Sequence, residues 1–498
     1  MGFRSNLAKP FAALIAFQTK KWSLRPVLTQ QNVFNYLINS AKRTLFGKDH
    51  GFDDIKNYYD FRKQVPIRDY EKLKPYINKV TEGMSNILWP DKPIYLAKTS
   101  GTTSGTKYIP VTKDSISNHI NGARDTLLSY IHQTGNSSFV DGKLIFLSGS
   151  PLLSETAGIK TGRLSGIVNH HVPQYLRGNQ KPSYSTNCIE DWEEKLEKII
   201  DETINSPMTL ISGIPPWVQM YFDRIYSRTG KKIMDVFPDF SVFVHGGVNF
   251  EPYKSKLVES IGKEVDSIET YPASEGFIAY HDWVDDGLLL ILNSGIFFEF
   301  ISMDEYFSDN PKRIGIEEVE IGKNYALIIN NNAGLWGYSI GDTVRFVSKN
   351  PYRIKVTGRI KHFISAFGEH VIGEEVEISM NRTMQKFLEV KLVEFTVCPQ
   401  VTPTEGLPHH EWLIEFENPP NDAIAFVEEL DSQLRSMNSY YNDLIIGNIL
   451  CKLKLVTIRK NGFIDYMRSK GKLGGQNKMP RLSNDRTIAN ELRSYITK

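Results

Sequence analysis

The chain has 498 residues, which is more than one compact hydrophobic core normally accommodates, so its length predicts two or more domains. With 41% hydrophobic and 23% charged residues it has the composition of a globular protein, and a disordered or fibrous protein is excluded. The 59 Lys and Arg residues almost balance the 57 Asp and Glu residues, which gives no reason to expect nucleic acid or an anionic membrane as the main partner.

The first 90 residues are predicted to be mostly helical. The apolar run at 11–17 is too short for a membrane span, and the polar residues after it do not fit a signal-peptide cleavage site, so we expect an amphipathic helix. Residues 28–47 carry an apolar stripe with a period near 3.6. The three cysteines lie far apart without C-x-x-C spacing, which favours buried thiols and a reduced, cytoplasmic setting.

Four segments in the middle of the chain share one pattern, an apolar run of strand length that ends abruptly in small or polar residues. They lie at 141–150, 207–217, 239–250 and 265–276. Helical patterns at 191–205 and 215–228 separate them, and this alternation predicts a mainly parallel sheet with helical crossovers. Ligands of open α/β sheets bind beyond the carboxyl ends of the strands, so the ends of these runs are the first place to look for a site.

After about residue 285 the sequence becomes rich in strands separated by turns, which predicts an antiparallel barrel or meander. Beyond it, three strand patterns flank one amphipathic helix at 422–441, as expected of a small α+β module. We therefore predict an α/β fold with a large N-terminal domain at 1–357, a hinge at 358–361, and a small, mobile α+β domain at 362–498.

A Gly/Ser/Thr-rich loop follows the strand predicted before residue 100. Its sequence, TSGTTSGTK at 99–107, lacks the spacing of a Walker A loop and the Ser or Thr that would follow the lysine. Backbone amides and hydroxyls can still surround a polyphosphate that a lysine neutralises. A plain polar surface loop is the alternative. The predicted phosphate-binding residues are Ser100, Gly101, Thr102, Thr103, Ser104, Gly105 and Lys107.

This loop resembles the phosphate loop of the adenylate-forming superfamily, which includes acyl-CoA synthetases, luciferases and adenylation domains. ETYPASEG at 269–276 is similar to another segment of that superfamily. The resemblance implies that Tyr271 offers its ring to adenine, that Ser274 reaches the α-phosphate, and that Glu275 holds Mg²⁺, a cation that prefers oxygen ligands. It also implies that the glycine pair Gly246 and Gly247 lets the backbone lie flat against the base.

Three later segments extend the resemblance toward the C-terminus. GYSIGD supplies Asp342, whose carboxylate would accept both ribose hydroxyls. TGRIKHF at 357–363 places Arg359 near the ribose and Lys361 at the pivot between the domains. GGQNKMPR supplies Lys478, which would contact the substrate carboxylate and the α-phosphate. Taken one at a time, these residues could be a turn former, a surface ion pair and a solvated loop charge.

The details of these segments resemble one family within that superfamily, the auxin-responsive acyl acid–amido synthetases, whose plant members conjugate auxin, jasmonate or benzoates to amino acids. The resemblance covers nearly the whole chain. It implies a ligase that uses ATP and Mg²⁺ to adenylate a carboxylic acid and then transfers the acyl group to an amine, with a monomer favoured. An acyl-CoA or acyl-carrier ligase, and an inactive nucleotide-binding regulator, remain as alternatives.

Overall fold

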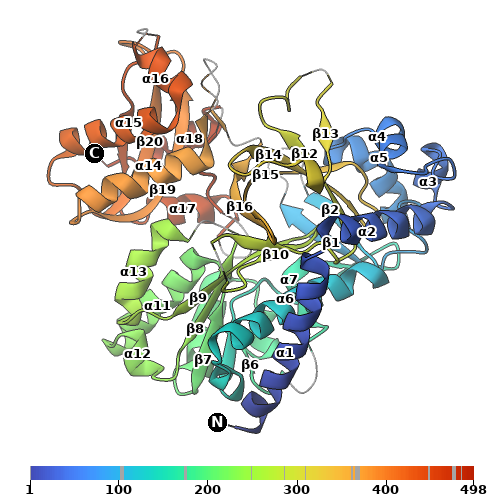
Figure 1. Cartoon of the computed structure of the whole chain (residues 1–498). Coiled ribbons are helices and arrows are strands. Elements are labelled where there is room, and N and C mark those ends of the chain that lie inside the picture. Colours follow the sequence, from blue (N-terminus) through green and yellow to red (C-terminus); the bar gives the residue numbers. More distant parts are fainter. Residues whose placement is uncertain are drawn as a thin grey trace. The chain divides into compact units, whose positions relative to one another are not determined.

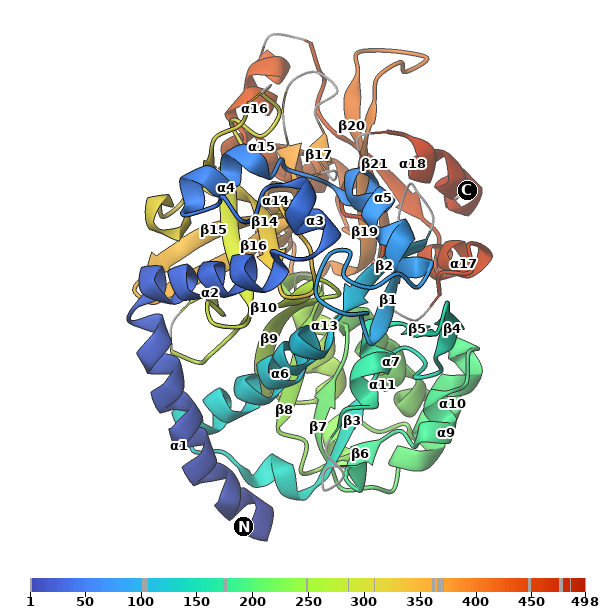
Figure 2. The ribbon, with the colours of Figure 1, turned by 90° about the vertical axis from the view of Figure 1, so that its right-hand side faces the viewer.

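The computed structural model describes residues 2–100, 106–172, 177–247, 250–284, 286–308, 310–360, 363–364, 369, 371–446, 449–473, 478–483 and 485–497. Figures 1 and 2 show the ribbon from two directions. The chain divides into two compact units. The first comprises Met1–Val248 and Ser260–Val356, and the second comprises Asn249–Glu259 and Thr357–Lys498.

The N-terminal unit begins with helices, as the apolar periodicity predicted. They are α1 (Phe3–Ser23), α2 (Pro26–Ala41), α3 (Leu45–Asp49), α4 (Tyr58–Gln64) and α5 (Tyr70–Thr81). Three of them start at a polar side chain that accepts a hydrogen bond from the helix backbone, namely Thr44, Asn57 and Asp69. Such caps satisfy amide groups that a helix end otherwise leaves without a partner.

A small sheet carries the predicted phosphate loop. Its strands are β1 (Tyr95–Ser100), β2 (Thr106–Val111), β4 (Ser154–Thr156) and β5 (Ile159–Gly162), in the order β2-β1-β5-β4. β1 is antiparallel to β2 and parallel to β5. The loop joins β1 to β2, and its residues 101–105 lie outside the described residues.

The four predicted parallel strands, together with the short strand β6 that was not predicted, form the parallel part of a twelve-stranded sheet, in the order β9-β8-β7-β3-β6. They are β3 (Lys143–Phe146), β6 (Gln180–Lys181), β7 (Met208–Ser212), β8 (Val242–Gly246) and β9 (Asp266–Ala273). All neighbours among them are parallel. The helical elements of this region are α6 (Lys113–Thr134), η1 (Ser138–Asp141), α7 (Leu164–Asn169), α9 (Tyr184–Asn187), α10 (Trp192–Thr203), α11 (Pro215–Thr229) and α12 (Ile233–Val236).

Later strands extend the same sheet with antiparallel pairings, so the predicted strand-rich region is continuous with the parallel part; it is not a simple meander, because β11 pairs with β16 and β12 pairs with β14. Beyond β9 the order is β10-β11-β16-β15-β14-β12-β13. These strands are β10 (Gly276–Tyr280), β11 (Leu288–Leu290), β12 (Ile296–Ser302), β13 (Arg313–Ile314), β14 (Asn324–Asn331), β15 (Tyr338–Lys349) and β16 (Tyr352–Arg359), with the short helix η2 (Ile316–Glu318). Continuous burial of β12 shows that the sheet has both faces covered there.

The C-terminal unit has the predicted α+β character. Its three-stranded sheet has the order β19-β20-β21, formed by β19 (Lys391–Gln400), β20 (His409–Asn418) and β21 (Lys454–Ile458). The other elements are β17 (Phe363–Ile364), β18 (Val371–Ile372), α14 (Gly373–Lys386), α15 (Ala423–Met437), α16 (Ser439–Ile446), α17 (Gly462–Ser469), α18 (Thr487–Leu492) and η3 (Arg493–Tyr495).

Helix α13 (Glu251–Ile261) links β8 to β9 along the chain, yet residues 249–259 belong to the C-terminal unit. The hydroxyl of Tyr253 accepts a hydrogen bond from Arg481 at 2.6 Å and donates one to Glu394 at 3.1 Å. Arg481 also forms ion pairs with Glu377 and Glu394. A buried guanidinium with two carboxylates and a phenol thus fastens this helix to the unit.

The predicted fold class is confirmed, with a large N-terminal unit and a smaller α+β unit. The hinge at 358–361 and the mobility of the smaller domain stay predictions, and Lys361 lies outside the described residues. In the described part of the chain, no helix has both the length and the apolar character required to span a bilayer.

Candidate functional site

The predicted glycine pair lies at the carboxyl end of β8, beside β9. Gly246 is paired with Thr270, and a Cβ atom at Gly246 would lie 2.3 Å from the Thr270 carbonyl oxygen. That distance is far below van der Waals contact, so only glycine allows the two strands to approach this closely. Gly247 follows with a φ of 82°, which favours glycine as well.

Tyr271 and Asp342, 71 positions apart in the sequence, meet through a hydrogen bond. The Tyr271 hydroxyl on β9 donates to Asp342 Oδ2 on β15 over 2.6 Å. Both residues are buried, with 7% of each exposed. The bond fixes the orientation of the Asp342 carboxylate at the junction between the parallel and antiparallel halves of the sheet, where the resemblance implied an adenosine site.

Ser274 and Glu275 form the two-residue turn between β9 and β10, and both are half-buried. The Asn331 side-chain amide donates to the Glu275 carbonyl oxygen at 2.7 Å, which holds this turn against the end of β14. Tyr338 directs its hydroxyl toward Glu275 Oε1 at 3.5 Å. Burial, followed by the nearby charge of Glu275, raises the pKa of Tyr338 well above its ordinary value, so this phenol remains a hydrogen-bond donor at neutral pH.

Lys107 and Ser100 lie on the two strands that flank the predicted phosphate loop. Ser100 is paired with Thr106 across the hairpin, one position from the pair of Thr99 and Lys107. The ammonium group of Lys107 lies 5.4 Å from the centre of the Tyr70 ring, and the backbone amide of Tyr108 donates to the Tyr70 hydroxyl. Gly101, Thr102, Thr103, Ser104 and Gly105 fall outside the described residues.

Arg359 and Lys478 both belong to the C-terminal unit. Arg359 ends β16 and is exposed. Lys478 is exposed as well, in a segment whose continuation is bound to β19: the Thr396 hydroxyl donates to the Pro480 carbonyl at 2.7 Å, and the backbone amides of Val397 and Ser483 complete the pairing. Lys478 therefore lies just before a strand-like segment that hydrogen bonds hold against β19.

The structure thus brings together Tyr271, Asp342 and the Ser274–Glu275 turn, and it adds residues that the sequence patterns did not assign. Tyr338 lies four positions before Asp342, in the GYSIGD segment already singled out, so that segment contained a signal for it. Tyr70 comes from the N-terminal helices. Its contact with Lys107 is a tertiary contact that no local pattern indicates.

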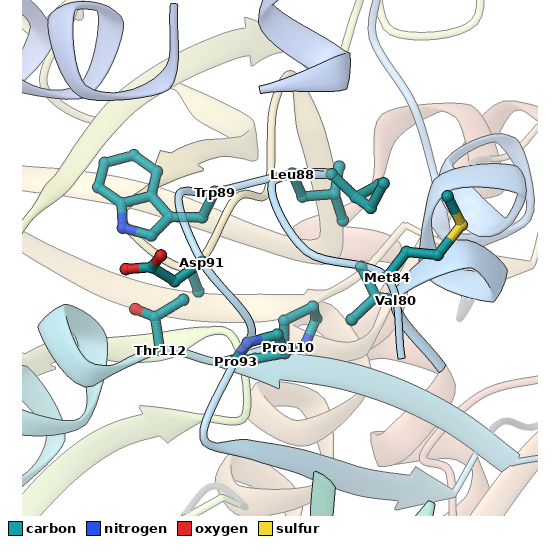
Figure 3. A pocket seen from close by; sticks show the side chains of 10 residues that line it. Val80, Met84, Leu88, Trp89, Asp91, Pro93, Pro110 and Thr112 are labelled. Atoms are coloured by element: carbon teal, nitrogen blue, oxygen red, sulfur yellow. The ribbon is translucent and has the colours of Figure 1, made fainter. Parts of the chain in front are cut away.

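Other candidate groups are less suited to the chemistry. Burial, with a smaller contribution from His281, lowers the pKa of His245 to about 3, so this imidazole is neutral at physiological pH. The pocket in Figure 3 lies elsewhere in the N-terminal unit and is lined mainly by apolar side chains such as Met84, Leu88 and Pro110. Its volume of about 10 Å³ admits roughly one water molecule, so it is too small for a substrate.

Glu275 is the one predicted metal ligand. Among the described residues there is no group of three or more His, Cys, Asp or Glu side chains that would form a dedicated metal centre. Mg²⁺ keeps several waters and is usually bound through one or two carboxylates together with substrate phosphates, so a single carboxylate such as that of Glu275 could serve as its protein ligand. A half-buried carboxylate in a fixed turn at the carboxyl end of the sheet meets that requirement.

Solved structures define the class of fold. The chain superposes on the GH3.15 acyl acid amido synthetase with a TM-score of 0.79 at 15% identity, covering 96% of this chain and 95% of that one. It also superposes on 2-hydroxyisobutyryl-CoA ligase in the postadenylation state, with a TM-score of 0.61 at 12% identity and coverage of 94% and 92%. The fold is therefore that of the adenylate-forming ligases.

Family models then identify the family within this class of fold. The N-terminal, central and C-terminal domains of the GH3 family match residues 18–180, 289–359 and 374–487. These matches cover most of the chain, and the chain belongs to the GH3 family. The family predicted from the sequence is confirmed.

Curated relatives are distant plant proteins. A jasmonoyl–L-amino acid synthetase of Nicotiana attenuata is 21% identical over 64% of this chain and 66% of its own length. An indole-3-acetic acid-amido synthetase of Arabidopsis thaliana is 26% identical over 38% of this chain and 34% of its own length. A jasmonoyl–L-amino acid synthetase of Oryza sativa subsp. japonica is 22% identical over 94% of this chain and 92% of its own length. The chain thus spans slightly less than two thirds of the first relative and about a third of the second.

Proposed function

We propose that this protein is an amide-forming ligase that adenylates a carboxylic acid with ATP and transfers the acyl group to an amino acid. The observation that carries the proposal is the buried hydrogen bond between Tyr271 and Asp342, with the Ser274–Glu275 turn directly after it. In a GH3 family chain, Asp342 would supply a ribose acceptor and Glu275 a metal ligand, both near the carboxyl end of β9. The names of the relatives, two jasmonoyl–L-amino acid synthetases and an indole-3-acetic acid-amido synthetase, support the same reaction class.

The adenosine part of ATP would lie against the end of β9. The ring of Tyr271 gives the base a flat face, and the backbone at Gly246 and Gly247 admits it without a side chain in the way. The carboxylate of Asp342, oriented by the Tyr271 hydroxyl, would accept hydrogen bonds from the ribose hydroxyls. The family resemblance gives Arg359 a role toward the same ribose. Residues 100–105 and Lys107 would hold the β- and γ-phosphates.

In the first step, a carboxylate oxygen attacks the α-phosphorus and the bond to the bridging oxygen breaks, releasing pyrophosphate. Ser274 would hydrogen-bond the α-phosphate, and Lys478 would neutralise the charge that builds up on the phosphate and the attacking carboxylate. Mg²⁺ held by Glu275 would supply further charge neutralisation. The product is an acyl-adenylate, in which AMP has become a good leaving group.

In the second step, the neutral amine of an amino acid attacks the acyl carbon. The amide bond forms, AMP leaves, and the amine releases one proton to solvent. Withdrawal of Lys478 by rotation about 358–361 would open the path for the amine. Gly358 supports a hinge at this position, because its φ of 150° is a conformation that residues with a Cβ atom rarely adopt.

A pyrophosphate-release screen that crosses carboxylic acids with amino acids tests the proposal. We expect release that requires an acid, and AMP and amide formation that require an amino acid. Product formation with coenzyme A in place of an amino acid would instead identify a thioester ligase. The prediction of a cytoplasmic monomer rests on the sequence alone.

Lys478→Ala should reduce the adenylation rate by at least roughly 100-fold, because it removes charge stabilisation from the transition state. Lys472→Ala is the matched control, an exposed lysine of the same unit that has no assigned role. An inactive regulator would show no acid-dependent pyrophosphate release with any acid, and Lys478→Ala would leave its ATP affinity unchanged.

A further inference from the structure

Arg163 follows the last residue of β5, next to the strand that carries the predicted phosphate loop. β5 runs parallel to β1, with Ala97 paired to Gly162. The next residue, Arg163, therefore emerges beside β1 shortly before Ser100, where that strand leads into the loop. Figure 2 shows β5 and α7 in the same region as α9 and α10.

Two glycines allow close packing around Arg163, one against its side chain and one against the neighbouring backbone. A Cβ atom on Gly149, in the loop after β3, would lie 2.8 Å from Cδ of Arg163. A Cβ atom on Gly166, in α7, would lie 2.4 Å from the carbonyl oxygen of Ser150 in the same loop. The arginine stem therefore lies over a glycine at the carboxyl end of a parallel strand, the edge of the sheet where ligands bind.

The surroundings of Arg163 are positively charged. Among the described residues, Arg163 forms no ion pair with a carboxylate. Its cationic neighbour Lys195 is buried and donates to two neutral groups, the carbonyl oxygens of Ser148 at 2.9 Å and Asn187 at 2.8 Å. The pKa of Lys195 is lowered to about 8, mainly by burial; the nearby Cys188 thiol opposes this shift, and the charge of Arg163 contributes to it.

Ser165 adds a polar group to the same place. Its hydroxyl oxygen is buried, has no hydrogen-bond partner among the described residues, and lies 3.3 Å from the position of a Cβ atom on Gly149. The stem of an arginine that has no carboxylate partner among the described residues and a hydroxyl without a partner there therefore border the same glycine. Such a set fits a carboxylate, because a guanidinium can donate two parallel hydrogen bonds to it and the hydroxyl can donate a third.

We propose that Arg163 and Ser165 bind the α-carboxylate of the amino acid acceptor. This inference rests on the proposed function. The carboxylate of the acyl substrate is converted to a mixed anhydride with the phosphate of AMP and loses its charge, whereas the carboxylate of the acceptor remains charged throughout and needs a permanent cation. Lys195 is a positioning residue, since it ties the loop after β3 to the end of α9.

Arg163→Gln tests the proposal through the two half-reactions. Acid-dependent exchange of pyrophosphate into ATP, measured without an amino acid, should stay within twofold of wild type. The KM for the amino acid in amide formation should rise roughly 10- to 100-fold, as expected for loss of hydrogen bonds to a charged group. An amine with the same side chain but without the carboxylate should be used equally by both proteins. Arg163→Lys should recover part of the affinity.

Arg177→Gln is the matched control, because the acceptors of this exposed arginine within the described part of the chain are two backbone carbonyls, those of Val172 and His170. It should leave every parameter unchanged. An unchanged KM for the amino acid in Arg163→Gln overturns the proposal. A raised KM for the acid in the exchange reaction also overturns it, since the carboxylate would then be a second one on the acyl substrate.

Calorimetric titration with an L-amino acid and with its methyl ester provides a readout that does not depend on turnover. Wild type should bind the amino acid at least tenfold more tightly than the ester, and Arg163→Gln should bind both equally weakly. Equal binding of acid and ester by wild type contradicts the inference. Failure of the proposed function would instead appear as absence of acid-dependent exchange in wild type.

Discussion

The hydrogen bond between Tyr271 and Asp342 allows a sharp test of the adenosine site. Tyr271→Phe keeps the aromatic face available to the base and removes only the phenolic hydroxyl that orients the carboxylate over 2.6 Å. A hydrogen bond to a charged group contributes about 1.5–3 kcal/mol. Because about 1.4 kcal/mol corresponds to a factor of ten, we expect the KM for ATP to rise roughly 10- to 100-fold.

The same strand provides a matched control at its other end. Tyr130 donates to Asp266 Oδ2, also over 2.6 Å, and Asp266 is the first residue of β9. Tyr130→Phe removes the same kind of bond from the first residue of the same strand, at the end opposite to the predicted site. It should lower the free energy of unfolding by about as much as Tyr271→Phe does, and it should leave the KM for ATP unchanged.

The assay is acid-dependent exchange of pyrophosphate into ATP at varied ATP concentration, together with urea unfolding of each variant. If Tyr271→Phe left the KM for ATP within twofold of wild type, Asp342 would not be a ribose acceptor positioned by this phenol. If both tyrosine variants raised the KM equally, the effect would follow from general destabilisation of β9, and the site assignment would lose its support.

Three further predictions concern packing and burial. Gly246→Ala should cost about 1–3 kcal/mol by forcing β8 away from β9 and should raise the KM for ATP, whereas Gly178→Ala, which has open space around it, should change neither quantity. Burial lowers the pKa of His119 to about 4 from 6.5, so the unfolded chain binds the extra proton between these values. Stability should therefore fall by about 3 kcal/mol as pH drops through that window, and His119→Leu should lack this loss in urea titrations at pH 7 and 4.5. Arg313→Met should lower the free energy of unfolding by about 3–5 kcal/mol, since it leaves the Glu299 carboxylate buried without its guanidinium partner, and a calorimetric melting point close to that of wild type would contradict this.

Local patterns were sufficient for much of the fold. Apolar runs ending at small residues predicted β3, β7, β8 and β9 and their parallel arrangement, because a buried parallel strand has a distinctive composition. The ETYPASEG segment singled out Ser274 and Glu275 as candidate site residues, and the structure places them in the turn between β9 and β10. The continuation of that sheet into an antiparallel half depends on which strands pair, and the strand patterns alone do not specify pairing.

The contacts that complete the site were harder to predict. Tyr70 reaches Lys107, and Asn331 reaches the carbonyl of Glu275, through tertiary packing between segments that are far apart in the sequence. The positive surroundings of Arg163 also depend on Lys195, a lysine in an amphipathic helix pattern that would ordinarily be solvated. Sequence periodicity shows which face of an element is apolar, and it does not show which distant polar groups will face each other.

The position of α13 in the chain has a consequence for how the protein can be assembled and divided. The ribosome completes Tyr253 before it begins residues 357–498, which contain Arg481 and Glu394, the hydrogen-bond partners of that tyrosine. During synthesis, helix α13 therefore cannot make these contacts until the strands from β9 to β16, and then the partner residues that follow them, have been made. A fragment that starts at Thr357 would lack Tyr253, whose hydroxyl accepts a hydrogen bond from Arg481. A single cut therefore does not release the complete C-terminal unit. Fragment complementation would have to supply α13 as a separate peptide.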